Sequence, residues 1–179
     1  MTDVYESATT SPAIHTRLLD ELDWAALRLC GFEANGDTQG YWWFYADDGV
    51  FDLEAGVENL DETEKASLRE VVALLRRDKP ETFAEGSWRW ALARYLDGET
   101  DSEDLCEYGH VEIFRSLLRK PENTGEIRAD HLSVKGGFWS SRPVQDGFGG
   151  WITVITPECT RWVNTHEIER ELLAKCLGE

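Results

Sequence analysis

A chain of 179 residues with 41% apolar residues and eight tryptophans can bury a full hydrophobic core, which argues against a disordered chain and predicts one domain. Thirty-five acidic residues stand against eighteen basic ones, a net charge of −17. This charge disfavours direct binding to nucleic acid or to an anionic membrane and favours a basic protein partner. Acidity that serves solubility alone is the open alternative.

The N-terminus and the cysteines predict a cytoplasmic protein. The chain begins with no basic segment and no apolar run, so we expect no signal peptide. No apolar segment is long enough to span a bilayer, and we expect no membrane partner. The four cysteines form no C-x-x-C pair and match no zinc-binding spacing, which predicts reduced thiols and neither a metal nor another cofactor.

The first thirty residues divide into a polar segment and a periodic one. Residues 1–11 are polar, and we expect a flexible N-terminus there. Apolar residues then recur every three or four positions across residues 12–30, which predicts a helix. Residues 12–179 are expected to form a single domain.

An aromatic run, YWWFYA, follows at residues 41–46 and predicts a strand. The turn residues at 47–49 predict a hairpin in which residues 50–54 pair back on it. Because neighbouring side chains of a strand point to opposite faces, only one of Trp42 and Trp43 can face the core.

Three helices are predicted in the middle of the chain, over residues 62–77, 83–96 and 100–119. Each is preceded by an N-cap residue with Glu three positions later, the spacing of a capping box. The pairs are Asp61 with Glu64, Thr82 with Glu85, and Thr100 with Glu103.

The last third of the chain changes to strand patterns. Residues 126–134 alternate weakly and predict a strand, whereas the glycine-rich residues 135–150 predict a loop. Residues 151–156 and 160–163 predict a second hairpin.

A final helix is predicted after Asn164, which has capping spacing with Glu167. Its periodic apolar residues, Ile168, Leu172 and Cys176, are expected to face inward. The order of elements predicts an α+β fold in which helices pack against a small antiparallel sheet built from two hairpins.

The stretch DGETDSEDLCEYGHVEIF, residues 97–114, contains seven carboxylates and no Lys or Arg. A calcium loop starting at Asp97 fails, because Ser102 stands where the turn needs Gly and Tyr108 where a bidentate Glu is needed. We therefore interpret the stretch as a surface for a basic partner, together with the acidic and aromatic residues of the first hairpin. The predicted partner-binding residues are Trp42, Trp43, Asp47, Asp48, Asp52, Glu54, Asp97, Glu99, Asp101, Glu103, Asp104, Glu107 and Glu112.

The segment GYWWFYADDGVF, residues 40–51, resembles the G-x-W-x-F…N-G-x-F segment of the ArdB/KlcA antirestriction family. It departs from that pattern by having Asp48-Gly49 in place of Asn-Gly. The resemblance implies a protein of a phage or mobile element that counters host defence, and it transfers no functional residue.

The hypothesis that unites these features is an acidic inhibitor without enzymatic activity. It would block the nucleic-acid-binding surface of a host defence complex, in the manner of antirestriction or anti-CRISPR proteins that mimic DNA. An immunity protein that neutralises a basic toxin is one alternative. A small enzyme that uses Asp130, His131, Ser140 and Ser141 is the other, although no catalytic motif is present.

Overall fold

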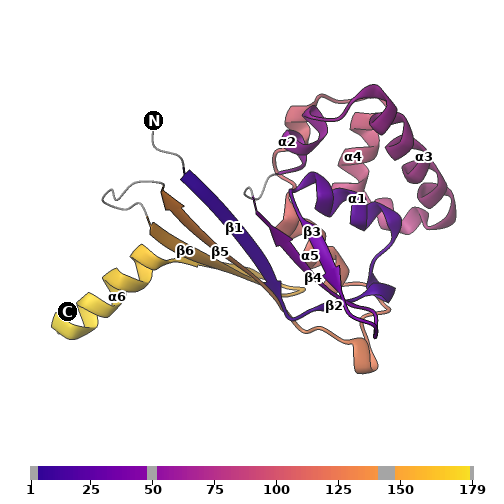
Figure 1. The fold of residues 1–179 in the computed structure, drawn as a ribbon. Helices are drawn as coiled ribbons and strands as arrows, with labels where there is room; N and C mark the ends of the chain where they lie inside the picture. Colours follow the sequence, from indigo (N-terminus) through magenta and orange to yellow (C-terminus); the bar gives the residue numbers. More distant parts are fainter. Residues whose placement is uncertain (1–3, 48–51, 141–147, 178–179) are drawn as a thin grey trace.

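The computed structural model describes residues 4–47, 52–140 and 148–177, and this part of the chain has six α-helices and a seven-stranded antiparallel sheet. The predicted α+β class is confirmed. None of the helices within these ranges is long and apolar enough to cross a bilayer. The helices α1 to α5 lie together on one side of the sheet, and α6 projects near its far end (Figure 1).

The strands are β1 (Val4–Ser11), β2 (Ile14–His15), β3 (Glu33–Gly36), β4 (Tyr41–Ala46), β5 (Leu132–Ser140), β6 (Phe148–Ile155) and β7 (Thr160–Asn164). The helices are α1 (Glu21–Leu29), α2 (Leu53–Glu58), α3 (Glu62–Asp78), α4 (Trp88–Leu96), α5 (His110–Leu118) and α6 (Thr165–Leu177). Short 3-10 helices are η1 (Thr16–Leu18), η2 (Pro80–Phe83), η3 (Ser102–Leu105) and η4 (Gly125–Ile127).

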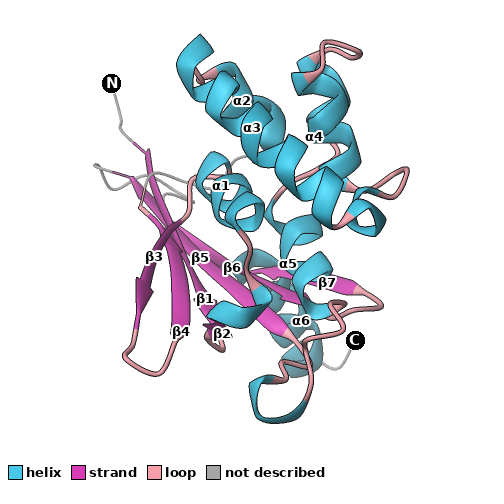
Figure 2. Cartoon of the chain, turned by 90° about the vertical axis from the view of Figure 1, so that its right-hand side faces the viewer, coloured by secondary structure: helices cyan, strands magenta, loops and turns pink. Residues whose placement is uncertain are grey.

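β1 is a central strand, so the predicted flexible N-terminus is wrong from residue 4 onward. The strands pair in the order β2-β4-β1-β5-β6-β7, and β3 also pairs with β4 (Figure 2). β1 pairs along its whole length with β5, from Val4 opposite Ser140 to Ser11 opposite Ser133. The sequence did not predict this strand, because β1 is largely polar and its pairing partners are distant in the sequence. Those partners provide the backbone hydrogen bonds that a strand needs.

The aromatic strand β4 forms a hairpin with β3, which precedes it, and the described residues 52–54 of the predicted partner strand do not pair with it. Leu53 and Glu54 form the first turn of α2, and Asp52 caps that helix through a 2.9 Å bond from the Ala55 amide to its Oδ1. Residues 48–51 lie outside the described ranges. The predicted second strand is therefore wrong, because an N-cap aspartate starts a helix where β-propensity predicted pairing.

Local capping chemistry sets where α1 and α3 begin. The predicted capping box of Asp61 and Glu64 is present, and α3 closely matches its predicted range. The helix predicted for residues 12–30 starts only after Asp20, which forms a capping box with Asp23. The residues before it belong to β2 and η1.

The helices predicted at 83–96 and 100–119 are both shorter in the structure. α4 starts after Ser87, whose Oγ accepts a bond from the Trp90 amide. The second prediction breaks into η3 and α5, with Gly109 as the N-cap of α5. The expected cap residue Thr100 has no hydrogen-bond partner for its buried Oγ1 among the described residues.

The glycine-rich residues 135–150 are not a loop where the structure describes them. They continue β5 and β6, and only residues 141–147 lie outside the described ranges. A Cβ on Gly136 would lie 2.3 Å from the Trp151 ring, and one on Gly149 would lie 2.3 Å from Phe138. Glycine is needed here so that aromatic rings can lie flat across the neighbouring strand, a packing reason that turn statistics do not include.

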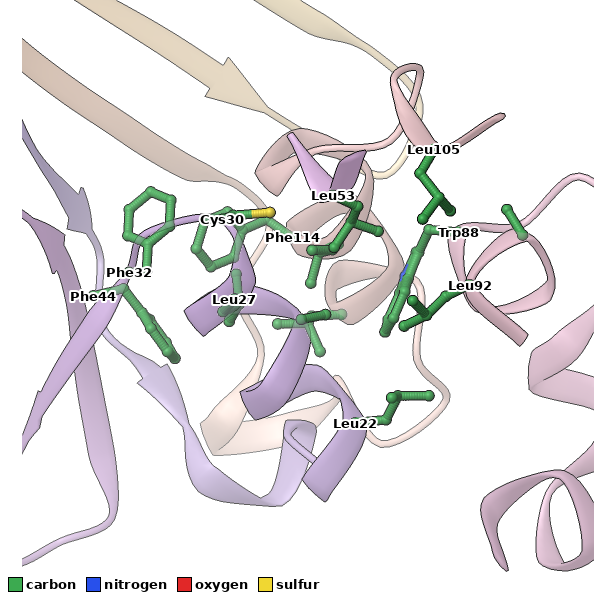
Figure 3. Packing of buried hydrophobic residues seen from close by; sticks show 14 of the residues in the cluster. Leu22, Leu27, Cys30, Phe32, Phe44, Leu53, Trp88, Leu92, Leu105 and Phe114 are labelled. Atoms are coloured by element: carbon green, nitrogen blue, oxygen red, sulfur yellow. The ribbon is translucent and has the colours of Figure 1, made fainter. Parts of the chain in front are cut away.

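The hydrophobic core lies between the helices and one face of the sheet (Figure 3). Phe114 of α5 joins the two layers, since its ring contacts Phe44 of β4 at 5.7 Å and Phe32 at 5.6 Å between centroids. Leu27 of α1 and Leu92 of α4 are completely buried in the same cluster. α1, α4, α5 and the sheet therefore form one folding unit.

α6 has the predicted cap but not the predicted packing. Asn164 and Glu167 exchange the two capping bonds. Ile168 and Leu172 are 43% and 55% exposed, however, and Cys176 is also exposed. The expectation that this side faces inward is wrong, because α6 contacts mainly β6 and β7 beside its own start and no other layer of the described residues covers it.

Candidate acidic interface

The structure brings α2 into contact with η3, and thereby joins two acidic segments that are distant in the sequence. The Leu53 amide donates to the Tyr108 carbonyl at 2.8 Å, which ties the start of α2 to the end of the acidic stretch. Leu53 and Val57 of α2 and Leu105 of η3 are completely buried beneath this junction. The shared core leaves the polar sides of both segments in solvent.

The carboxylates of the two segments influence one another electrostatically. The hydroxyl of Ser102 donates to Glu58 Oε1 at 3.1 Å, which bridges η3 and α2. Burial first, and then the charges of Asp52, Glu58 and Glu103, raise the pKa of Glu54. We call this surface the acidic interface, and its residues are Glu54, Glu58, Asp101, Glu103, Asp104 and Glu107. None of the six forms an ion pair with a described residue.

A hollow of about 320 Å³ lies within the acidic interface. Glu103, Asp104 and Glu107 line it together with Trp90, Tyr108 and Arg94. The Arg94 guanidinium lies 4.8 Å from the centre of the Trp90 ring and pairs with Glu99, outside the acidic interface. Burial, followed by Glu107 and the other nearby carboxylates, raises the pKa of Tyr108. The three carboxylates of the hollow suit the side chain of a partner's lysine or arginine.

Two predicted residues at the start of the acidic stretch are compensated by bases. Asp97 Oδ2 is 2.9 Å from Arg76 Nη1, and Glu99 Oε2 is 3.2 Å from Arg94 Nε. Because these exposed carboxylates already have cations beside them, they contribute less potential to a partner than the six residues of the acidic interface do.

Other predicted residues have local roles or lie elsewhere. Glu112 Oε2 accepts from the Gly109 amide at 3.2 Å and so caps α5, as Asp52 caps α2. Asp47 is exposed directly after β4. Asp48 lies outside the described ranges. Because the helix predicted over residues 100–119 is divided into η3 and α5, Asp101 and Glu112 do not lie on one continuous helix.

The two adjacent tryptophans point to opposite faces, as predicted. The Trp42 ring packs edge-on against Trp24 of α1, with 5.2 Å between ring centroids. Trp43 is 42% exposed on the other face of the sheet. Trp42 thus serves the packing of α1 on the sheet, and neither tryptophan belongs to the acidic interface.

Sequence reasoning missed Glu58, the residue that η3 contacts directly. It was missed because residues 50–54 were predicted to form a strand. The four-residue spacing of Leu53 and Val57, directly after the N-cap residue Asp52, is the helical signal that could have identified α2.

The described residues give the enzyme alternative no assembled site. Asp130 pairs with Arg128 at 2.6 Å, and both side chains are largely exposed. His131 is exposed and has no hydrogen bond to Asp130 within the described ranges. Ser140 ends β5, and Ser141 lies outside those ranges. No group of three or more His, Cys, Asp or Glu among the described residues could hold a metal ion.

Comparison with known proteins adds no family to this picture. No protein-family model, no curated protein and no solved structure matches the chain. The function must therefore be argued from the site.

Proposed function

We propose that this protein is an inhibitor whose acidic interface binds the nucleic-acid-binding surface of a basic partner protein and keeps nucleic acid away from it. The observation that carries the proposal is the convergence of α2 and η3, which gathers six carboxylates, none of which forms an ion pair with a described residue. A structure that needed acidity only for solubility would have no reason to gather its carboxylates, since like charges in proximity destabilise the fold.

Long-range electrostatics support a basic partner. A net charge of −17 attracts a positively charged groove at a distance and raises the rate of encounter. The hollow beside Trp90 then offers a place for one basic side chain of the partner. The same field repels free nucleic acid, so the protein would compete with nucleic acid and not bind it.

The partner class that we propose is a host defence complex that binds DNA or RNA, such as a restriction or CRISPR complex. The resemblance of residues 40–51 to the ArdB/KlcA family is the reason to name this class. The chemistry of the acidic interface requires only that the partner's surface be basic.

The test is capture of partners from a nuclease-treated bacterial lysate, followed by binding measurements with the purified captured protein. In the interface variant, Glu54, Glu103 and Glu107 become Gln and Asp104 becomes Asn. We expect its affinity to fall at least tenfold, because each exposed charge contributes up to about 1 kcal/mol. Affinity of the unmodified protein should fall steeply with salt, and a DNA duplex should compete.

The matched control removes four carboxylates that lie outside the acidic interface, by changing Glu122, Glu126, Glu158 and Glu169 to Gln. All four are exposed. Since each variant replaces four carboxylates by amides, both variants change the net charge equally. The control should retain nearly full affinity. Equal losses in the two variants, or binding that ignores salt, would reject the acidic interface. A captured toxin that still binds its nucleic acid would support the immunity alternative instead.

A further inference from the structure

A cavity of about 480 Å³ lies between the start of α4 and the length of α5, and it adjoins the acidic interface at Tyr108. Arg89 of α4, Arg115 of α5 and Arg119 directly after α5 line it, together with Ser87, Trp88 and Ser116. Three arginines around one cavity are unexpected in a chain with so few bases. The cavity is therefore the place in the described structure where positive charge gathers around a space that a ligand can enter.

The first of these arginines is buried but has an unused donor. The Arg89 side chain is 3% exposed, and its Nη2 alone contacts both carboxylates that face it, Asp20 Oδ2 at 2.8 Å and Asp23 Oδ1 at 2.5 Å. Its Nη1 has no hydrogen-bond partner among the described residues. A buried guanidinium nitrogen without an acceptor is costly, so an acceptor supplied from the cavity would stabilise it.

Lys120 also lines this cavity, but its donors are occupied. Its Nζ contacts Asp23 Oδ2 at 2.5 Å and the Leu18 carbonyl at 2.8 Å. Lys120 and Arg89 together offset the charges of Asp20 and Asp23. This buried group of four thus fixes the position of Arg89 and leaves Arg115 and Arg119 as the cations that can bind a ligand in the cavity.

Arg115 of α5 and Arg119, the residue that follows this helix, are held by neutral acceptors. Arg115 Nη2 donates to Thr160 Oγ1, and Arg119 Nε donates to the Pro157 carbonyl at 2.6 Å. The Arg115 Nε is buried without a partner. Neither arginine forms an ion pair with a carboxylate in the described ranges. Two positioned guanidinium groups without counter-ions suit an oxyanion, which accepts their bonds in parallel.

The N-terminus of α4 also favours an anion in this cavity. Ser87 Oγ caps the Trp90 amide at 3.2 Å, and Ser87 and Trp88 both line the cavity. The first amides of an α-helix have no acceptor within the helix and carry partial positive charge, which favours an anion beside them.

We propose that this cavity binds the phosphate group of a small organic phosphate, with Arg115, Arg119 and the N-terminus of α4 around the phosphate oxygens and Arg89 behind them. Trp88 and Tyr108 line the same cavity and offer apolar surface to the organic part of the ligand. Of these residues, only Tyr108 also lines the hollow on which the proposed inhibitory function relies.

A small ligand fits this cavity better than a nucleic-acid chain does. Tyr108 lines both this cavity and the hollow of the acidic interface, so the two adjoin. A polyanion that extended beyond the cavity would meet the carboxylates of that interface. Glu81 and Glu112 also line the cavity and formally equal the charges of Arg115 and Arg119, which makes low ionic strength the condition in which to look for binding.

The test is titration of the full chain with inorganic phosphate, and then with a phosphate monoester, against chloride at matched ionic strength. NMR of the tryptophan indole groups gives the readout, since Trp88 Nε1 donates to Ser116 Oγ at 3.1 Å inside the cavity. We expect the Trp88 indole signal to shift with saturation for phosphate and not for chloride. Identical shifts with both salts would overturn the site.

Two matched variants locate the binding. Changing Arg115 and Arg119 to Gln should weaken phosphate affinity roughly tenfold or more, because two charge-assisted bonds are lost. Changing the exposed Arg128 and Arg161 to Gln, an equal change of charge, should leave it unchanged. Unchanged affinity in the first pair would overturn the proposal. If that pair does not fold, Arg119→Gln alone is used, since this residue follows α5 and is exposed.

A short DNA duplex separates the two sources of phosphate. Weaker binding of the duplex than of the monoester is expected. Tighter binding of the duplex at the Trp88 signal would overturn the assignment to a small molecule.

Discussion

His110 shows at the residue scale how burial sets the charge state of a side chain. Its ring lies 5.7 Å from Phe32 and 6.4 Å from both Phe114 and Trp151, measured between centroids. Its Nε2 is buried without a partner among the described residues. Burial lowers the pKa of His110 from 6.5 to about 4, so this side chain is neutral in the folded protein at neutral pH.

Protonation of His110 should make folding dependent on pH. Between pH 6.5 and 4 the unfolded chain binds a proton at His110 that the folded protein does not, so the free energy of unfolding falls as the pH falls. The loss attributable to His110 should reach at most about 3 kcal/mol at pH 4. Urea unfolding measured across this range tests it.

Two variants isolate this effect from the other titrating groups. His110→Leu should remove this part of the pH dependence, whereas His131→Gln, at an exposed histidine, should retain it. The lowered pKa of Asp20, where burial is outweighed by the charges of Arg89 and Lys120, acts at lower pH and is common to both variants. Parallel stability curves for wild type and His110→Leu would contradict the assignment.

Gly56 shows at the element scale how close packing positions the acidic interface. A Cβ on Gly56 would lie 2.4 Å from the backbone carbonyl oxygen of Leu29, at the contact between α2 and α1. A backbone atom cannot move aside as a flexible side chain can, so α2 can approach α1 this closely only with glycine at this position.

Gly56→Ala should therefore destabilise the protein by about 1–3 kcal/mol, the usual cost of overpacking. It should also weaken partner binding, because it displaces α2 and with it Glu54 and Glu58. Denaturant unfolding and the partner titration measure the two effects. Gly137→Ala is the control, since its Cβ would meet only the Gly149 carbonyl oxygen at an ordinary 3.7 Å. Equal stability of both variants would show that the contact between α1 and α2 is adaptable.

β1 is the element that unites the sheet at the scale of the whole molecule. It lies between β4, which packs on the helices, and β5, which leads into the C-terminal hairpin (Figure 1). α6 instead exposes Ile168, Leu172 and Leu173 and contacts mainly the two strands before it. The two ends of the described chain thus contribute very differently to the fold.

Truncation at each end should reveal this difference. Removal of residues 1–11 should abolish cooperative unfolding, because β4 and β5 would both lose the backbone bonds of a central strand. Removal of residues 165–179 should leave cooperative unfolding intact and cost little free energy. Circular dichroism and thermal unfolding of the two truncated proteins provide the measurement. A folded protein without β1 would contradict the sheet order.

The sequence by itself determined the features that depend on neighbours along the chain. Asp61 with Glu64, and Asn164 with Glu167, form the capping boxes that their spacing predicts, because capping is a contact across three residues. The hairpin of β6 and β7 formed as predicted for the same local reason. Composition likewise predicted a hydrophobic core, and the order of the predicted elements predicted the α+β class.

Only the tertiary structure decided the features whose partners are distant in the sequence. β1 is a central strand because it pairs with β5 along its whole length. Gly136 lies in a strand, where the Trp151 ring of the neighbouring strand covers it. α2 and η3 met over a shared core, which selected which acidic residues stand together. The sequence did not predict the arginine cavity for the same reason, since Arg89 and Arg115 belong to different helices. These contacts depend on long-range packing, which local patterns of polarity and secondary-structure propensity do not determine.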